Sequence, residues 1–146
     1  MPLCFSYGSN MDAAAMAARC PGAVALGLAR LPRHRLQAMR EGYLTAVRDP
    51  RRDLWGVLWD VPLSNMSALD RYEQVASGLY RKSLQMVIGG KGARRALVYF
   101  GANAGPGVLK PDYFSAVLEA AKAAALPPAA LAHIEGLSPR ASARAR

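Results

Sequence analysis

Residue types that carry much of protein chemistry are scarce in this chain of 146 residues. It has two cysteines, Cys4 and Cys20, and two histidines, His34 and His133. These four residues are too widely spaced to match a compact metal-ligand pattern, so we expect no metal and no other cofactor. The cysteines could form one disulfide, but nothing in the sequence points to an oxidising compartment. We therefore expect two free, buried thiols.

Long apolar runs are also missing. No stretch approaches the ~18 uninterrupted apolar residues of a membrane span, and the first residues lack the basic start and apolar core of a signal peptide. The sequence therefore predicts a soluble, cytoplasmic protein without a membrane partner.

Acidic residues are few: 10 Asp and Glu stand against 19 Lys and Arg, for a net charge of +9. This balance raises a basic nucleic-acid-binding β-barrel as one alternative. The arginines are spread in pairs and triplets along the chain, which is typical of a solvated surface, and the aromatic residues lie in apparent core runs. We expect no specific nucleic-acid partner, and at most a preference for small anions.

The residues that are present suffice for one core, because 52% of them are hydrophobic. We expect one domain over residues 1–137, followed by a flexible basic tail over 138–146 that lacks apolar periodicity. Short runs of period two predict strands, and alanine-rich or 3.6-periodic runs predict helices. The predicted strands are 3–7, 24–31, 34–39, 44–48, 54–60, 79–88 and 94–100; the predicted helices are 11–19, 64–73, 112–126 and a short one ending at Gly136. This order predicts an α+β domain whose mostly antiparallel sheet could close into a small barrel.

One candidate site is the turn Tyr7-Gly8-Ser9-Asn10, where the first strand passes into a helix. Such a turn exposes backbone N–H groups that suit a carboxylate or phosphate, and Gly8 would allow a ligand to approach the backbone. The alternative is a simple capped turn.

A second candidate is Glu73, at the end of the predicted helix 64–73. Asp70 and Glu73 could be solvated surface charges. However, the helix dipole disfavours an acid at a helix C-terminus, so Glu73 is a mild anomaly.

Together these motifs resemble the γ-glutamylcyclotransferase family, also called AIG2-like. The resemblance runs in order over residues 3–100, with a weaker echo at Tyr113. Its motifs are Phe5-Ser6-Tyr7-Gly8-Ser9-Asn10-Met11, Arg19-Cys20-Pro21, Gly27-Leu28-Ala29-Arg30-Leu31, Leu54-Trp55-Gly56-Val57-Leu58-Trp59, and Leu69-Asp70-Arg71-Tyr72-Glu73 with Tyr80.

The resemblance implies a small mixed, mostly antiparallel β-barrel with flanking helices and a cavity at one end. It also implies an enzyme of the amidine-lyase or acyltransferase class, linked to glutathione metabolism, that releases 5-oxoproline from a γ-glutamyl amino acid or amine. Glu73 would be the catalytic acid/base. The substrate-binding residues would be Tyr7, Gly8, Ser9, Asn10, Tyr80 and Tyr113. Relatives suggest a homodimer, whereas the sequence itself indicates nothing about assembly.

One departure concerns Gln74, because the family often has glycine beside the glutamate. The bulkier side chain leaves the fit of the substrate open. The leaving group is also open, because homologues of this fold act in other γ-glutamyl transfers, and glutathione is less favoured because its specific branch carries a different loop. The other alternative is a non-catalytic module of the same fold that binds a γ-glutamyl-like ligand. Glu73 favours the enzyme, because a pure binder does not need it.

Overall fold

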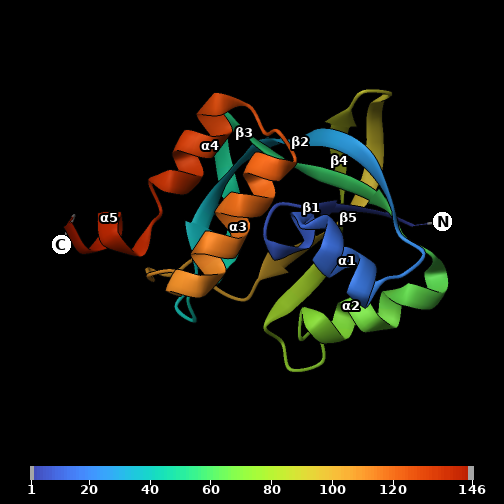
Figure 1. Cartoon of the computed structure of the whole chain (residues 1–146), viewed down its shortest axis with the longest axis horizontal. Coiled ribbons are helices and arrows are strands. Elements are labelled where there is room, and N and C mark those ends of the chain that lie inside the picture. The colour runs from blue at the N-terminus through green and yellow to red at the C-terminus, as the bar shows by residue number, and fades with distance from the viewer. Residues whose placement is uncertain (1, 145–146) are drawn as a thin grey trace.

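Five strands close into a barrel in the computed structural model, which describes residues 2–144 (Figure 1). The order around the barrel is β1-β3-β2-β4-β5, and the pairs are antiparallel except for β1 with β5, which is parallel. The predicted class, a small mixed and mostly antiparallel barrel with flanking helices, is therefore confirmed. The strands are β1 (Leu3–Ser6), β2 (Val24–Ala38), β3 (Leu44–Asp60), β4 (Tyr80–Gly89) and β5 (Gly92–Gly101).

The helices gather around the barrel in two groups. In Figure 1, α3 lies across the barrel with α4 beyond it, and α1 and α2 lie side by side near the N-terminal strand. The α-helices are α1 (Ala13–Arg19), α2 (Met66–Tyr72), α3 (Pro111–Ala123), α4 (Pro128–Glu135) and α5 (Pro139–Arg144), and the 3-10 helices are η1 (Ser9–Met11) and η2 (Leu63–Asn65).

Two strands are longer than the sequence pattern predicts. The predicted strands 24–31 and 34–39 form one strand, β2, which runs through Pro32, and the predicted strands 44–48 and 54–60 form one strand, β3, which runs through Asp49-Pro50. Pro32 pairs with Asp53 and His34 pairs with Arg48, so the ladder shifts register between these pairs. Arg33, with φ of 59°, lies at this shift. A bulge of this kind absorbs residues that cannot join the ladder, so the predicted breaks are irregularities within long strands.

The first helix also differs from its prediction over 11–19. Asp12 has extended backbone angles (φ −72°, ψ 120°), which separates η1 from α1. The N-cap of α1 is therefore Asp12, and no side chain caps the helix. The consequence is that Ser9 and Asn10 remain in the turn that faces the barrel.

The predicted strands 79–88 and 94–100 form a hairpin, because Gly89 pairs with Gly92 across a two-residue turn and Gly92 has a φ of 93°. The C-terminal segment has a short helix, α5, in the range predicted as a flexible tail. Residues 145 and 146 lie outside the described part, and the division at residue 137 remains a prediction.

Apolar side chains from every strand fill the core. The most deeply buried include Phe5, Leu31, Val87 and Val98 from the strands and Val117 from α3. Cys4 and Cys20 are buried and free, as predicted. Gly56 is required for close packing of β1 on β3, because a Cβ there would collide with the Ser6 carbonyl oxygen and the Phe5 ring. This close approach sets the path of β1 into the Tyr7–Asn10 turn.

Candidate active site

A pocket of about 130 Å³ opens at one end of the barrel, where β1 passes into η1. Its walls come from segments far apart in the chain: the Tyr7–Asn10 turn, the residues before and in β3, the C-terminal end of α2, β4, β5 and α3. The structure brings together all seven predicted site residues, and each lines this pocket: Tyr7, Gly8, Ser9, Asn10, Glu73, Tyr80 and Tyr113. Their roles remain predictions.

Glu73 enters the pocket from the end of α2. It is the C-cap residue, and its N–H donates to the Leu69 carbonyl oxygen at 3.0 Å. Its side chain is partly buried and accepts a hydrogen bond from Asn10 Nδ2 to Oε1 at 2.9 Å. Burial raises the pKa of Glu73 from 4.5 to about 7, against an opposing effect of the Arg19 charge. A carboxyl group with this pKa can accept and release a proton near neutral pH.

The turn after Glu73 ends α2 with two backbone hydrogen bonds. The Gln74 N–H donates to the Arg71 carbonyl oxygen and the Val75 N–H donates to that of Asp70, each at 3.1 Å. This pair of bonds is the Schellman pattern, in which the residue after the C-cap adopts a left-handed backbone and is usually glycine. Here that residue is Gln74, with φ of 53°.

Gly8 lies beside Tyr113 of α3. An added Cβ at Gly8 would stand 3.0 Å from the Tyr113 hydroxyl oxygen, so only glycine leaves this space free. The Tyr113 hydroxyl also accepts a hydrogen bond from the Leu44 N–H at 3.3 Å. α3 thus packs directly against the turn and completes one wall of the pocket.

The other predicted tyrosines are anchored by the backbone of the barrel. The Tyr80 hydroxyl donates to the Leu44 carbonyl oxygen at 2.6 Å, and the Tyr7 hydroxyl donates to that of Tyr99. Burial raises the pKa of Tyr7, Tyr80 and Tyr113 above the ordinary value. All three are therefore neutral hydroxyls at physiological pH, suited to shaping the pocket and not to carrying charge.

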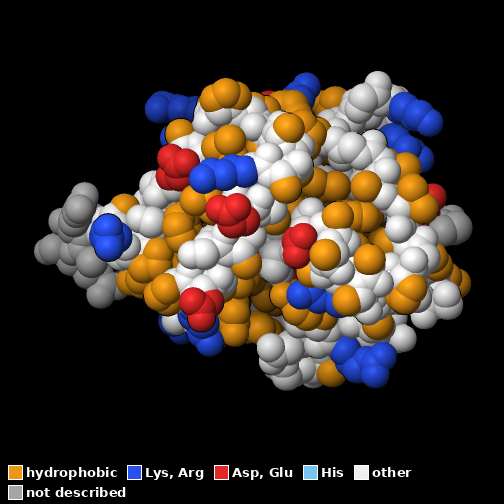
Figure 2. Space-filling model, viewed as in Figure 1, with side chains coloured by type: hydrophobic (Ala, Val, Ile, Leu, Met, Phe, Trp, Pro, Cys, Tyr) orange, Lys and Arg blue, Asp and Glu red, His pale blue; other side chains and the backbone are white. Residues whose placement is uncertain are grey.

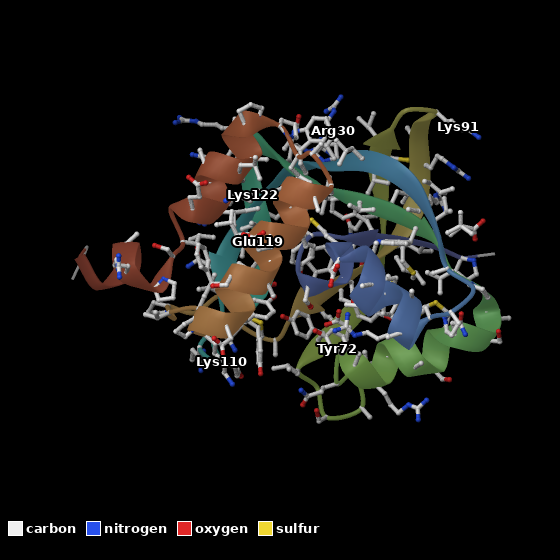
Figure 3. All side chains as sticks on the ribbon, in the orientation of Figure 1. Arg30, Tyr72, Lys91, Lys110, Glu119 and Lys122 are labelled. Carbon is white, nitrogen blue, oxygen red and sulfur yellow. The ribbon has the colours of Figure 1, made fainter. Side chains whose placement is uncertain are left out.

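Sequence reasoning missed four residues of this region: Arg19, Tyr43, Tyr72 and Tyr99. Tyr72 lies at the end of α2 that faces α3 (Figure 3), and its hydroxyl is 2.6 Å from Ser9 Oγ. Arg19 donates to Asn10 Oδ1, and its guanidinium lies 3.4 Å from the centre of the Tyr72 ring. Arg19 and Tyr72 belong to motifs that carried the resemblance, so a signal existed for them. Tyr43 and Tyr99 line the pocket only because the closed barrel brings their segments of the chain next to the turn.

Among the described residues, no group of three or more His, Cys, Asp or Glu side chains is placed to hold a metal ion. In residues 2–144, no helix is long and apolar enough to cross a membrane.

The basic charge does not gather in one place on the face shown in Figure 2, where Lys and Arg side chains are scattered among hydrophobic and other residues. Four aromatic residues that a nucleic-acid surface would expose are buried instead: Phe5, Trp59, Tyr99 and Phe100.

Comparison with known proteins places this arrangement in a family. Residues 53–134 match the model of the AIG2-like family. Because this match covers more than half of the chain, the chain belongs to the AIG2-like family, as its motifs predicted.

Curated relatives carry a more specific name. The chain is 35% identical over 88 residues to the gamma-glutamylcyclotransferase of Bos taurus, an alignment that covers 53% of this chain and 47% of the relative. The gamma-glutamylcyclotransferase of Homo sapiens is 34% identical over the same coverage. The alignment thus spans about half the length of these relatives.

Solved structures extend the similarity to nearly the whole chain. A gamma-glutamyl cyclotransferase superposes with a TM-score of 0.87 at 26% identity, covering 94% of this chain and 88% of the other. An uncharacterised protein from Homo sapiens superposes with a TM-score of 0.85 at 27% identity and the same coverage. The barrel described above is therefore the fold of these proteins.

Proposed function

We propose that this chain is a γ-glutamylcyclotransferase-type enzyme, which converts a γ-glutamyl amino acid or amine to 5-oxoproline and a free amine. The observation that carries the proposal is the position of Glu73: its carboxyl group lies in the same pocket as the Tyr7–Asn10 turn and is hydrogen-bonded to Asn10. The family and the named relatives support the same reaction.

The substrate would supply its own nucleophile. The α-amino nitrogen attacks the γ-carbonyl carbon, a new C–N bond closes the five-membered lactam, and the original amide C–N bond breaks to release the amine. No serine or cysteine nucleophile is required. Cys4 fits this expectation, because it is buried and its pKa is raised to about 12. Holding the reacting atoms together would contribute roughly 7–11 kcal/mol relative to a bimolecular attack.

Glu73 would move the protons. Its ionised carboxylate accepts a proton from the α-ammonium group, and the resulting acid delivers that proton to the leaving nitrogen. The carboxylate then accepts the second proton, which the ring nitrogen loses as the lactam forms, and passes it to the departing amine, which leaves as an ammonium ion. One group can serve both steps because its pKa of about 7 leaves both protonation states populated near neutral pH. General acid/base catalysis of this kind is typically worth about 10²–10⁴-fold in rate.

The turn would hold the glutamyl moiety. Backbone N–H groups of Gly8, Ser9 and Asn10 are candidates for binding the α-carboxylate or for stabilising the oxyanion on the γ-carbonyl. Tyr7, Tyr80 and Tyr113 would enclose the aliphatic part of the substrate.

The test is release of 5-oxoproline from a panel of γ-glutamyl dipeptides, γ-glutamylamines and glutathione. Wild type would be compared with Glu73→Gln, which keeps the size and the hydrogen-bond acceptor but removes the titratable proton. We expect turnover of at least one member in the wild type and a loss of about 10²-fold or more in the variant. The matched control is Glu119→Gln, an exposed acid on α3, which should retain full activity.

Two results would contradict the proposal. If Glu73→Gln kept its turnover, Glu73 would not be the acid/base residue. If the wild type turned over no member of the panel but bound one in calorimetry, the non-catalytic binding module would replace the enzyme.

A further inference from the structure

The Asn10 side chain links two charged groups on opposite sides. Its Nδ2 atom donates to Glu73 Oε1 at 2.9 Å, and its Oδ1 atom accepts from the guanidinium of Arg19. Asn10 is only 5% exposed, so water has little access to replace either bond. The three side chains form one connected series, Arg19 to Asn10 to Glu73.

The two ends of an amide are not equivalent in this series. An arginine side chain has only donors, so it accepts no hydrogen bond from the NH₂ group of asparagine and must face its oxygen. With the oxygen turned toward Arg19, the NH₂ group is turned toward Glu73. The reverse orientation would place the amide oxygen against the carboxylate, where two acceptors repel each other unless the carboxyl group is protonated.

Arg19 is itself held in place. Its guanidinium lies over the Tyr72 ring at 3.4 Å from the ring centre, and the Tyr72 hydroxyl is 2.6 Å from Ser9 Oγ. The stacking fixes the plane of the guanidinium, since arginine stacks on aromatic faces as well as forming hydrogen bonds.

We infer that Arg19 is a positioning residue: it fixes the orientation of the Asn10 amide, and the amide in turn holds the Glu73 carboxylate in place for proton transfer. This inference rests on the proposed function for its catalytic meaning, but the coupling between Arg19 and Glu73 is a property of the free protein. Arg19 is not among the residues that line the pocket; it bonds to Asn10, which does line it, and its charge also acts on Glu73.

The surroundings of Glu73 make the coupling measurable. Among the described residues, the charged group that acts on the Glu73 pKa is Arg19, which lowers it. The other titratable groups whose own pKa values respond to Glu73 are phenols from the turn, β4, β5 and α3. Burial raises the pKa of each, so they are neutral in the working range: Tyr7, Tyr80, Tyr99 and Tyr113.

The experiment is a carbon-13 NMR titration of the Glu73 carboxyl group in the free protein, with the signal assigned by its loss in Glu73→Gln. Arg19→Met removes both the charge and the donor that orients Asn10. We expect the apparent pKa of Glu73 to rise by about 1 pH unit or more in Arg19→Met. Arg19→Lys keeps a cationic donor but lacks the planar guanidinium group, so the rise in the Glu73 pKa should be smaller than in Arg19→Met.

Arg71→Met is the matched control, because it removes the same charge from an exposed position two residues before Glu73. It should leave the titration unchanged. An unchanged pKa of Glu73 in Arg19→Met, or an equal shift in Arg71→Met, would overturn the inference. If Arg19→Met fails to fold, Arg19→Lys decides: a pKa of Glu73 equal to that of the wild type would overturn the inference, and an upward shift would support it.

Activity provides a second readout. If the protein has cyclotransferase activity, the acidic limb of its pH profile of kcat should move upward with the titration, whereas a purely structural role would lower the rate equally at all pH values. The titration does not depend on a substrate. If the protein proved to have no cyclotransferase activity, the NMR result would still be valid. An unchanged titration of Glu73 in an active enzyme would contradict only the proposed role of Arg19.

Discussion

Glu73, the proposed acid/base residue, carries a cost in stability. Its pKa in the folded protein is about 7, against 4.5 for an unperturbed glutamate. Between these values the folded protein holds a proton that the unfolded chain has released. The free energy of unfolding therefore falls as the pH rises through this range, and the full cost is present above about pH 7.

Glu73→Gln should remove this cost, because glutamine is neutral at every pH and can still accept the Asn10 hydrogen bond. We expect the variant to be more stable than wild type at about pH 8.5, by up to about 3 kcal/mol, and nearly equal to it at about pH 4. Urea denaturation at the two pH values measures the difference. A stability gain that is the same at both would show that Glu73 is ionised throughout and that its burial does not shift its pKa.

At the scale of the element, the end of α2 forms the Schellman hydrogen bonds but has an unfavourable residue at the left-handed position. The Schellman bonds are formed, yet the left-handed position is occupied by Gln74 with φ of 53°. A side chain in this conformation costs roughly 1–2 kcal/mol, which glycine avoids at the expense of greater freedom in the unfolded chain. Gln74 also lines the pocket.

Gln74→Gly is therefore expected to stabilise the protein by about 0.5–1 kcal/mol, measured by chemical denaturation. The same change at Gln85, within β4, should destabilise it, because glycine weakens a strand interior and no left-handed backbone is relieved there. If both variants lost stability equally, the strain at Gln74 would not be real.

The same elements show how far the sequence could lead. The strand-turn unit around Tyr7 and the helix carrying Glu73 were predictable, because turn residues and local periodicity are written in consecutive positions. The continuous course of β2 through Pro32 was not. A proline signals a break locally, whereas the register shift that accommodates it depends on the facing strand β3.

The site shows a similar division. Glu73 and the turn were found through their motifs, but the contact of Gly8 with Tyr113 depends on how α3 packs across the barrel. The orientation of Asn10 depends on Arg19 and Glu73 at once. Such arrangements arise from tertiary packing, which residue spacing does not encode.

At the scale of the whole molecule, the net charge of +9 affects how the protein binds polyanions. It predicts retention on heparin or DNA columns at low salt through the release of counterions. Because the charge is dispersed over the visible surface (Figure 2), we expect this retention to disappear by about 0.2 M salt and to show no sequence preference. Sequence-selective binding that persists at that salt concentration would restore a specific nucleic-acid partner.

The parallel pairing of β1 with β5 has a consequence for the order of events during synthesis. β1 carries the turn that begins the pocket, yet the strand that closes the barrel beside it is the last of the five to be made. A nascent chain that has already exposed Tyr7 and Glu73 on leaving the ribosome still has no pocket until β5 docks and α3 brings Tyr113 to Gly8. The pocket is therefore completed late, and shorter translation products would contain its motifs without its geometry.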